Sequence, residues 1–250
     1  NFDLSELKIF TTENQTAVLD RYFLESGDKI RYFFEEEAFG PKGNLIQEKQ
    51  RSINKIGHAL HELDPVFEKF SYQPAFLQIA RDLGIKTPAI AQSQYIFKQA
   101  RIGGVVHPHT DSTFLHTTPL SCIGAWLALE DATTENGCLS FIPGSHKMYP
   151  LQQLYVRNKE GTGTEFIDTL HERANWDLKR LLPVEVKRGD LGLLHGSVVH
   201  ASNPNRSKRS RHAYIIHFID LDAEWSPNNW LQRPQNRPFR PMTSVIEKLN

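Results

Sequence analysis

The first third of the chain carries a hydrophobic pattern typical of helices. In residues 73–85, apolar side chains recur at the spacing of one helical face, at Phe76, Ile79, Ala80 and Leu83. Upstream, Asp64 can cap a helix whose first residue is Pro65. The segment 52–63 also has a composition that favours a helix. These patterns predict a flank of mixed structure that contains several helices.

From residue 88 onwards the pattern changes to short apolar runs bounded by turn residues. These runs predict strands at 89–97, 123–129, 138–142, 184–186, 191–194 and 211–218. Asn136-Gly137 is a strong hairpin signal, whereas residues 150–180 predict a long loop or insert. Many short strands accompanied by helices predict a mainly β fold with flanking helices. Its core would be a double-stranded β-helix of the jelly-roll or cupin type.

Composition narrows the classes of protein without defining the activity. The 29 basic and 29 acidic residues give a net charge of zero, which argues against nucleic acid or a membrane surface as a partner. No apolar run approaches the roughly 20 residues of a membrane span. We expect one domain over 1–250, with a flank at 1–87 and the core at 88–250. Because the chain starts with Asn1 instead of methionine, we expect its beginning to be incomplete.

The cysteine content predicts a location. Only Cys122 and Cys138 are present in 250 residues, too few for a disulfide framework. A reducing compartment is therefore expected, and the protein is predicted to be intracellular, in the cytoplasm. The sequence does not predict an oligomeric state.

Histidine and aspartate lie close together in the segment 106–111. His109 and Asp111 are two residues apart, so on a strand both side chains would face the same side. With a third histidine from a distant strand they would form a two-histidine, one-carboxylate triad. Such a triad binds non-haem Fe(II) and leaves coordination positions open. A His-x-Asp tripeptide alone is common, so its meaning depends on the third ligand.

Four downstream histidines could supply that ligand: His195, His200, His212 and His217. We favour His200, which ends an apolar run and precedes Arg211 by eleven residues. A hairpin over that gap would bring Arg211 onto the strand beside His200. His195 is five residues earlier, and this odd offset would turn it to the other face. A buried arginine near a metal needs an anion, which a dicarboxylate such as 2-oxoglutarate would provide.

These residues, with two further motifs, carry a resemblance to a known family. Together with Glu135-Asn136-Gly137-Cys138-Leu139 and Pro143-Gly144-Ser145-His146, they resemble the phytanoyl-CoA dioxygenase family of Fe(II)- and 2-oxoglutarate-dependent oxygenases. Similar segments cover nearly the whole chain, at 26–31, 53–61, 95–99, 130–133 and 225–231. The resemblance implies a double-stranded β-helix that consumes O2 and 2-oxoglutarate, with ascorbate as a supporting reductant. It also implies oxidation of an unidentified small-molecule or acyl substrate, with a CoA-linked acyl group as one candidate.

The resemblance also assigns roles by position. The implied iron ligands and catalytic residues are His109, Asp111 and His200. The distal carboxylate of 2-oxoglutarate would pair with Arg211, helped by Ser202. Three further residues would line the cosubstrate pocket: Lys55, Gln94 and Trp126. Gln94 stands where a similar member of the family has methionine, so its contact would be polar. By the same resemblance, a carboxylate at position 111 favours hydroxylation or demethylation over halogenation.

Other interpretations remain open at this point. His107 could join His109 in a cupin-type metal site that catalyses no oxidation, the metal could be the zinc of a hydrolase, or the scaffold could be a binding module without catalysis. Among the other histidines, His61 and His116 are expected to come nearest the pocket. The basic run 206–211 predicts a solvated hairpin tip, or a rim that binds the phosphates of a CoA or nucleotide substrate.

Overall fold

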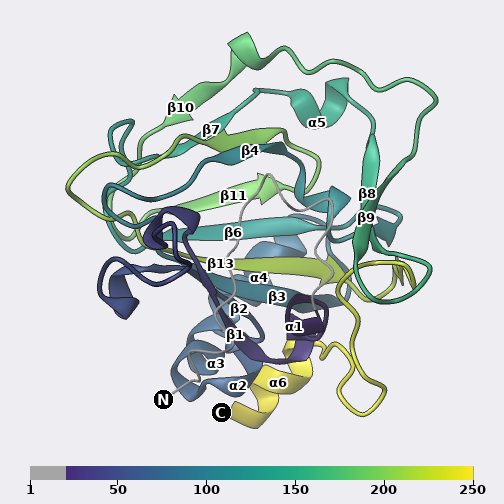
Figure 1. The fold of residues 1–250 in the computed structure, drawn as a ribbon. Helices are drawn as coiled ribbons and strands as arrows, with labels where there is room; N and C mark the ends of the chain where they lie inside the picture. Colours follow the sequence, from purple (N-terminus) through teal and green to yellow (C-terminus); the bar gives the residue numbers. More distant parts are fainter. Residues whose placement is uncertain (1–20, 250) are drawn as a thin grey trace.

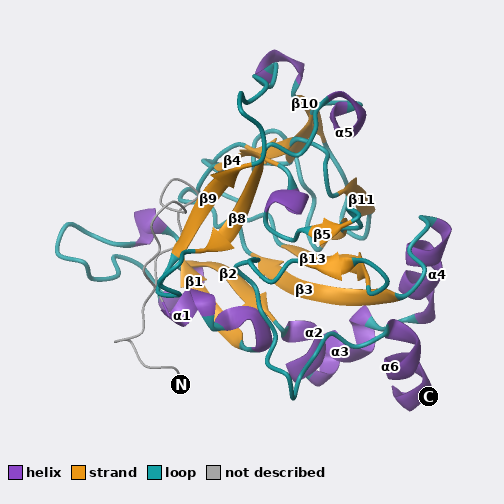
Figure 2. Cartoon of the chain, turned by 90° about the vertical axis from the view of Figure 1, so that its right-hand side faces the viewer, coloured by secondary structure: helices purple, strands orange, loops and turns teal. Residues whose placement is uncertain are grey.

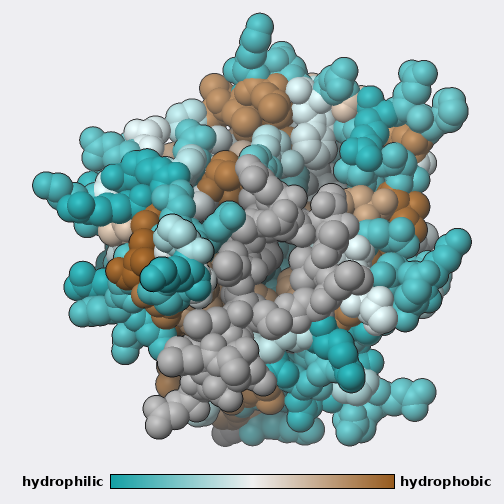
Figure 3. Space-filling view, in the orientation of Figure 1, coloured by the Kyte–Doolittle hydropathy of each residue, from teal (hydrophilic) through white to brown (hydrophobic). Residues whose placement is uncertain are grey.

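The structure is a computed structural model that describes residues 21–249. The expectation about the beginning of the chain falls outside these residues. Two antiparallel sheets face each other, with helices packed outside the larger one (Figure 1). No helix in residues 21–249 is long and apolar enough to cross a membrane. On the face seen in Figure 3, the described surface is mostly hydrophilic, and its apolar groups are small and separate.

The larger sheet has six strands and the smaller sheet has four. In spatial order the larger sheet contains β1 (Ile30–Phe34), β2 (Ile53–His58), β3 (Pro88–Ile96), β13 (Ala213–Asp220), β6 (Ile123–Ala128) and β11 (Leu191–His195). The smaller sheet contains β10 (Leu182–Val184), β7 (Leu139–Phe141), β12 (His200–Ser202) and β4 (Val106–His109). The last four of these strands along the chain alternate between the sheets: β10 and β12 lie in the smaller sheet, and β11 and β13 in the larger one.

The outer face of the larger sheet is covered by α2 (Leu60–Leu63), α3 (Pro65–Ser71), α4 (Pro74–Asp82) and α6 (Met242–Leu249) (Figure 2). Strand β13 shows how the two faces differ, because successive side chains of a strand point to opposite sides. Tyr214, Ile216 and Phe218 pack into the core that the helices cover. Ile215 and His217 line the space between the sheets.

Smaller elements complete the fold: α1 (Arg21–Leu24), α5 (Ser145–Met148), the pair β5 (Thr117–Thr118) and β14 (Glu224–Trp225), and the hairpin of β8 (Gln153–Arg157) and β9 (Thr164–Asp168). The hairpin occupies part of the region expected to be a loop. The predicted cap of α3 is confirmed, since Asp64 accepts hydrogen bonds from the backbone of Val66 and Phe67.

The helix predicted over 52–63 is wrong in its first half. Residues 53–58 form β2, and only Leu60–Leu63 make one helical turn. In β2, Ile53 and Lys55 face inward and the residue between them is less buried. Strands β1 and β3 pair with β2 on its two sides. This pairing satisfies the backbone of the segment, so tertiary contacts override the local preference.

Two predicted hairpins are also wrong, because the strands on either side of each turn lie in different sheets. The turn at Asn136-Gly137 exists, and Gly137 adopts a φ of 81°. The strands on either side of it, β6 and β7, nevertheless lie in different sheets. Likewise, Arg211 leads into β13 of the larger sheet, whereas His200 begins β12 of the smaller one. In a fold whose strands alternate between sheets, a connection of this kind crosses between the sheets instead of closing a hairpin.

Candidate metal and cosubstrate site

Three side chains meet at the end of the smaller sheet. His109 is the last residue of β4, His200 is the first residue of β12, and the register pairs the two directly. Asp111 lies just beyond β4, in a short 3-10 helix over Asp111–Thr113. The shared face predicted for a continuous strand is therefore wrong in detail, because a turn brings Asp111 beside His109.

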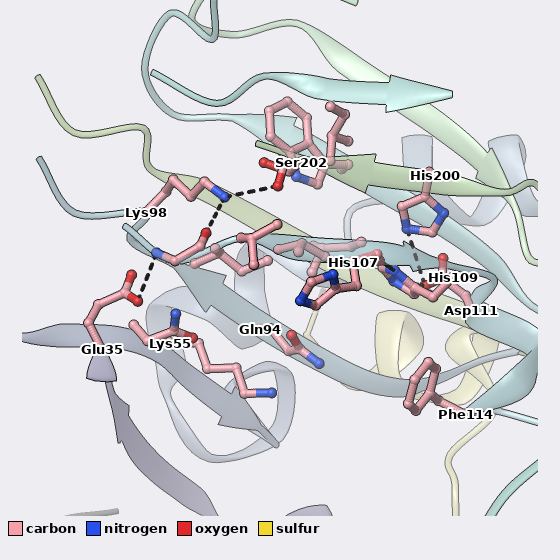
Figure 4. A pocket seen from close by; sticks show the side chains of 18 of the residues that line it. Glu35, Lys55, Gln94, Lys98, His107, His109, Asp111, Phe114, His200 and Ser202 are labelled. Carbon is pink, nitrogen blue, oxygen red and sulfur yellow. Dashed lines mark hydrogen bonds and ion pairs between the residues drawn. The ribbon is translucent and has the colours of Figure 1, made fainter. Parts of the chain in front are cut away.

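The triad atoms are close enough for one small ion. Asp111 Oδ1 lies 3.8 Å from His109 Nε2 and 3.7 Å from His200 Nε2. One ligand atom from each of the three residues lies within 4.8 Å of the other two. Figure 4 shows the three side chains converging at one end of the pocket. Two imidazoles and one carboxylate are a donor set that suits Fe(II).

Backbone hydrogen bonds orient both imidazoles. His109 Nδ1 lies 2.8 Å from the carbonyl oxygen of His107, and His200 Nδ1 lies 3.0 Å from that of Val198. A carbonyl can only accept, so each Nδ1 carries the proton and donates it. The lone pair of each Nε2 then faces Asp111, as a metal ligand requires.

The charges at the site agree with this arrangement. Burial lowers the pKa of His109 to about 4, and the neighbouring His200 contributes to the shift, so the imidazole is neutral and can donate its lone pair. Burial would raise the pKa of Asp111, but the imidazoles of His200 and His217 hold it below its usual value. The carboxylate is therefore ionised and ready for a cation. These residues fit an iron ion.

Arg211 lies in the same pocket without an acidic partner. Its Nε donates to the carbonyl of Gly137 at 3.2 Å, and its Nη2 donates to Ser202 Oγ at 3.2 Å. Its Nη1 is buried and makes no hydrogen bond, and no carboxylate in residues 21–249 forms an ion pair with it. Its Cζ lies 5.3 Å from the centre of the Trp126 ring. A buried guanidinium with a free donor is a binding site for an anion.

The spacing between this arginine and the triad suits a dicarboxylate. Ser202, which Arg211 contacts, is two residues beyond His200 on β12, so the two side chains share a face and their backbone positions are about 7 Å apart along the strand. That separation is comparable with the span of a five-carbon diacid. Ser202 Oγ itself donates to the Gly137 carbonyl at 2.8 Å, which holds the hydroxyl in place beside the guanidinium.

The other predicted pocket residues lie on the larger sheet. Lys55 on β2, Gln94 on β3 and Trp126 on β6 all line the cavity, and Figure 4 shows Lys55 and Gln94 across from Ser202. Burial lowers the pKa of Lys55 to about 7. Its ammonium lies 5.2 Å from the ring centre of Phe33. The structure thus brings all eight predicted site residues around one cavity.

Two histidines that were weighed as rival ligands lie apart from the triad. His195 lies outside the cavity, with its ring centre 4.9 Å from that of His146. His107 lines the mouth but is exposed, and it is not in the group of potential metal ligands found in the described chain. The residues of the described chain therefore favour His200 as the partner of His109 and Asp111.

An irregularity in the pairing of β4 with β12 separates His107 from His109. Val106 pairs with Ser202 and His109 pairs with His200. Two residues of β4, at positions 107 and 108, therefore lie opposite the single residue Ala201 of β12. Such a bulge changes the direction of the side chains on the longer strand, so the simple alternation that would place His107 beside His109 is interrupted between them.

Two buried histidines line the cavity without a role predicted from the sequence: His58, and His217, which was weighed as the third ligand and not favoured. His217 on β13 places Nε2 3.5 Å from Asp111 Oδ2, and His58 at the end of β2 packs against Trp230. His61 and His116, which were expected to come nearest, do not line it. Alternate residues of a strand share a face, so on the strand predicted over 211–218 residue 217 would face the same side as Arg211. This pattern could have identified His217.

The cavity has a volume of about 410 Å³. Beyond the triad its wall is largely aromatic and apolar, with contributions from Phe23, Phe114, Leu115, Tyr155 and Trp230. At the mouth, Arg206 pairs with Glu37 at 2.6 Å, and both side chains are about half exposed. Within the basic run, Arg211 is therefore buried in the cavity wall, and Arg206 is paired with a carboxylate at the rim.

The chain is similar in sequence to proteins of one family. A model of the family described as phytanoyl-CoA dioxygenase matches residues 4–213. A protein of Arabidopsis thaliana named phytanoyl-CoA dioxygenase is 47% identical over 93% of this chain and 80% of its own length. The mouse phytanoyl-CoA dioxygenase domain-containing protein 1 is 46% identical over 92% of this chain and 79% of its own length.

The chain belongs to the phytanoyl-CoA dioxygenase family. Solved structures agree with the fold of that family. The crystal structure of EctD from S. alaskensis, with 2-oxoglutarate and 5-hydroxyectoine, covers 92% of this chain and 85% of its own, with a TM-score of 0.56 and 18% identity. The epimerase SnoN, in complex with Fe3+, alpha ketoglutarate and nogalamycin RO, covers 78% of this chain and 75% of its own, with a TM-score of 0.57 and 18% identity.

Several predictions are thereby confirmed for this member of the phytanoyl-CoA dioxygenase family. They are the family itself, the double-stranded β-helix fold, and the class of 2-oxoglutarate-dependent non-haem iron dioxygenases. The roles of the individual site residues stay predictions, which the geometry above supports.

Proposed function

We propose that this chain couples the oxidative decarboxylation of 2-oxoglutarate to hydroxylation of a small-molecule or acyl substrate. The balance is one C–H bond, O2 and 2-oxoglutarate converted to one C–OH group, succinate and CO2. The observation that carries the proposal is that the triad and the unpaired Arg211 line one cavity. His109, Asp111 and His200 would hold Fe(II), which when bound supplies the activation of O2.

The residues of this chain would bind and orient the cosubstrate. Arg211 would pair with the distal carboxylate of 2-oxoglutarate, and Ser202 would fix the guanidinium and offer a further contact. Trp126 packs against Arg211 and excludes water from this end of the pocket. A charge-assisted hydrogen bond strengthens where water is excluded, so this packing supports the ion pair.

The rest of the cavity would hold the substrate. Its aromatic wall suits an apolar body, and the name of the relatives makes an acyl-CoA thioester one candidate class. Cys122 and Cys138 are both buried and free, which is consistent with action in a reducing compartment such as the cytoplasm.

The proposal is tested by turnover and by metal binding. Purified protein is supplied with Fe(II), 2-oxoglutarate, O2 and ascorbate, and succinate is measured with and without candidate substrates. Succinate that requires both iron and 2-oxoglutarate is expected. Its absence under all conditions would refute the oxygenase. Turnover that continues without O2 would instead favour a hydrolase or another non-oxidative metalloenzyme.

A matched pair of variants tests the ligand set. His200→Ala should abolish iron binding and succinate formation, because it removes one of three ligands. His195→Ala should retain both, since His195 lies outside the cavity. Iron bound per chain is measured after gel filtration. The opposite result would move the third ligand to His195.

A further inference from the structure

The two oxygens of Asp111 have different surroundings. Oδ1 faces His109 and His200, whereas Oδ2 lies 3.5 Å from His217 Nε2. Asp111, His217 and Gln92 are all buried and all line the cavity. Within residues 21–249, Asp111 Oδ2 and His217 Nε2 are both buried, and neither has a hydrogen-bond partner. Each of these two atoms is therefore placed to be the hydrogen-bond partner that the other lacks.

Gln92 determines which nitrogen of His217 carries the proton. His217 on β13 lies directly opposite Gln92 on β3, and Gln92 Nε2 is 3.3 Å from His217 Nδ1. An amide nitrogen only donates, so Nδ1 accepts and the proton of a neutral imidazole resides on Nε2. The reversed amide would put a proton on Nδ1 and aim a lone pair of Nε2 at a carboxylate oxygen, which is repulsive.

We propose that His217 is a positioning residue that donates from Nε2 to Asp111 Oδ2, so that Asp111 offers a metal only Oδ1. The inference rests on the proposed function, because it concerns the carboxylate that would hold iron. With one oxygen engaged, the triad occupies three coordination positions and leaves the others open. With both engaged, one fewer would remain for a chelating cosubstrate and O2.

The binding of Co(II) tests this role, with no turnover required. His217→Leu removes the donor and should weaken Co(II) affinity about 10- to 100-fold, the usual loss when a hydrogen bond to a ligand is removed. His217→Gln keeps a side-chain N–H donor that is long enough to reach Asp111 Oδ2, so it should retain most of the Co(II) affinity of the wild type. His217→Asn keeps the amide on a shorter side chain and should not. Gln92→Leu should fall between wild type and His217→Leu, and His195→Leu is the matched control.

Each outcome supports or overturns the role of His217. Wild-type affinity in His217→Leu would overturn it, and so would equal losses in His217→Gln and His217→Asn, since the role would then be packing alone. Far-UV circular dichroism checks folding, and if His217→Leu does not fold, the Gln and Asn pair decides. Wild-type protein that binds Co(II) but forms no succinate would refute the oxygenase alone. Wild-type protein that binds no metal would overturn both proposals.

Discussion

Arg211 is the residue whose removal should affect 2-oxoglutarate most. Arg211→Met keeps an apolar chain against Trp126 and removes the guanidinium. Because Nη1 is unpartnered and Nη2 is shared with Ser202, the distal carboxylate should gain one or two charged hydrogen bonds, with one worth about 1.5 to 3 kcal/mol. A loss of about 2 to 3 kcal/mol weakens 2-oxoglutarate binding about 30- to 150-fold.

The assay is an anaerobic titration of the Fe(II)-loaded protein with 2-oxoglutarate, followed by its visible charge-transfer absorption. Pyruvate is the control ligand, since it carries the same 2-oxo acid group that would chelate the metal but has no distal carboxylate. Wild type should prefer 2-oxoglutarate strongly, and Arg211→Met should lose that preference. Arg206→Met, at the exposed rim, is the control for loss of a positive charge. A variant at 211 that still prefers 2-oxoglutarate as wild type does would refute the assignment.

Two further predictions concern stability. Burial lowers the pKa of Lys55 to about 7, against 10.5 for an ordinary lysine, so the unfolded chain binds more protons between these values and stability should rise with pH across that range. In Lys55→Met, the free energy of unfolding measured with urea should rise less steeply with pH. The same dependence on pH as in the wild type would contradict this. The buried carboxylate of Glu62 pairs with Arg233, so Glu62→Ala should cost about 3 kcal/mol. Arg173→Ala, which breaks an exposed pair, should cost under about 1 kcal/mol, and equal losses would contradict the role of burial.

Local signals predicted the elements whose stability is local. The Asp64 cap is confirmed because it needs only the next turn of chain, and the 73–85 pattern gave α4 because its apolar face packs on a sheet. The helix expected over 52–63 was wrong because β2 is specified by two neighbouring strands. The hairpin expected at Asn136-Gly137 was wrong because a turn signal does not state which sheet receives the next strand.

The same distinction applies to the site. The triad could be proposed from the sequence because a short motif and a resemblance identified its members. The orientation of Asp111 could not, since it depends on a turn after β4 and on His217 from β13. The pairing of Gln92 with His217 likewise arises only when β3 and β13 lie side by side in register.

Strand β13 connects the two ends of the proposed cosubstrate site. Arg211 lies just before it, and Ile215 and His217 line the cavity from its inner face. The strand is paired on both sides, with β3 and β6, and is buried along nearly its whole length. A shift of one residue would turn these side chains toward the helices. The register of this one strand therefore fixes both the buried guanidinium of Arg211 and the imidazole beside Asp111, which is the rigidity that the proposed site requires.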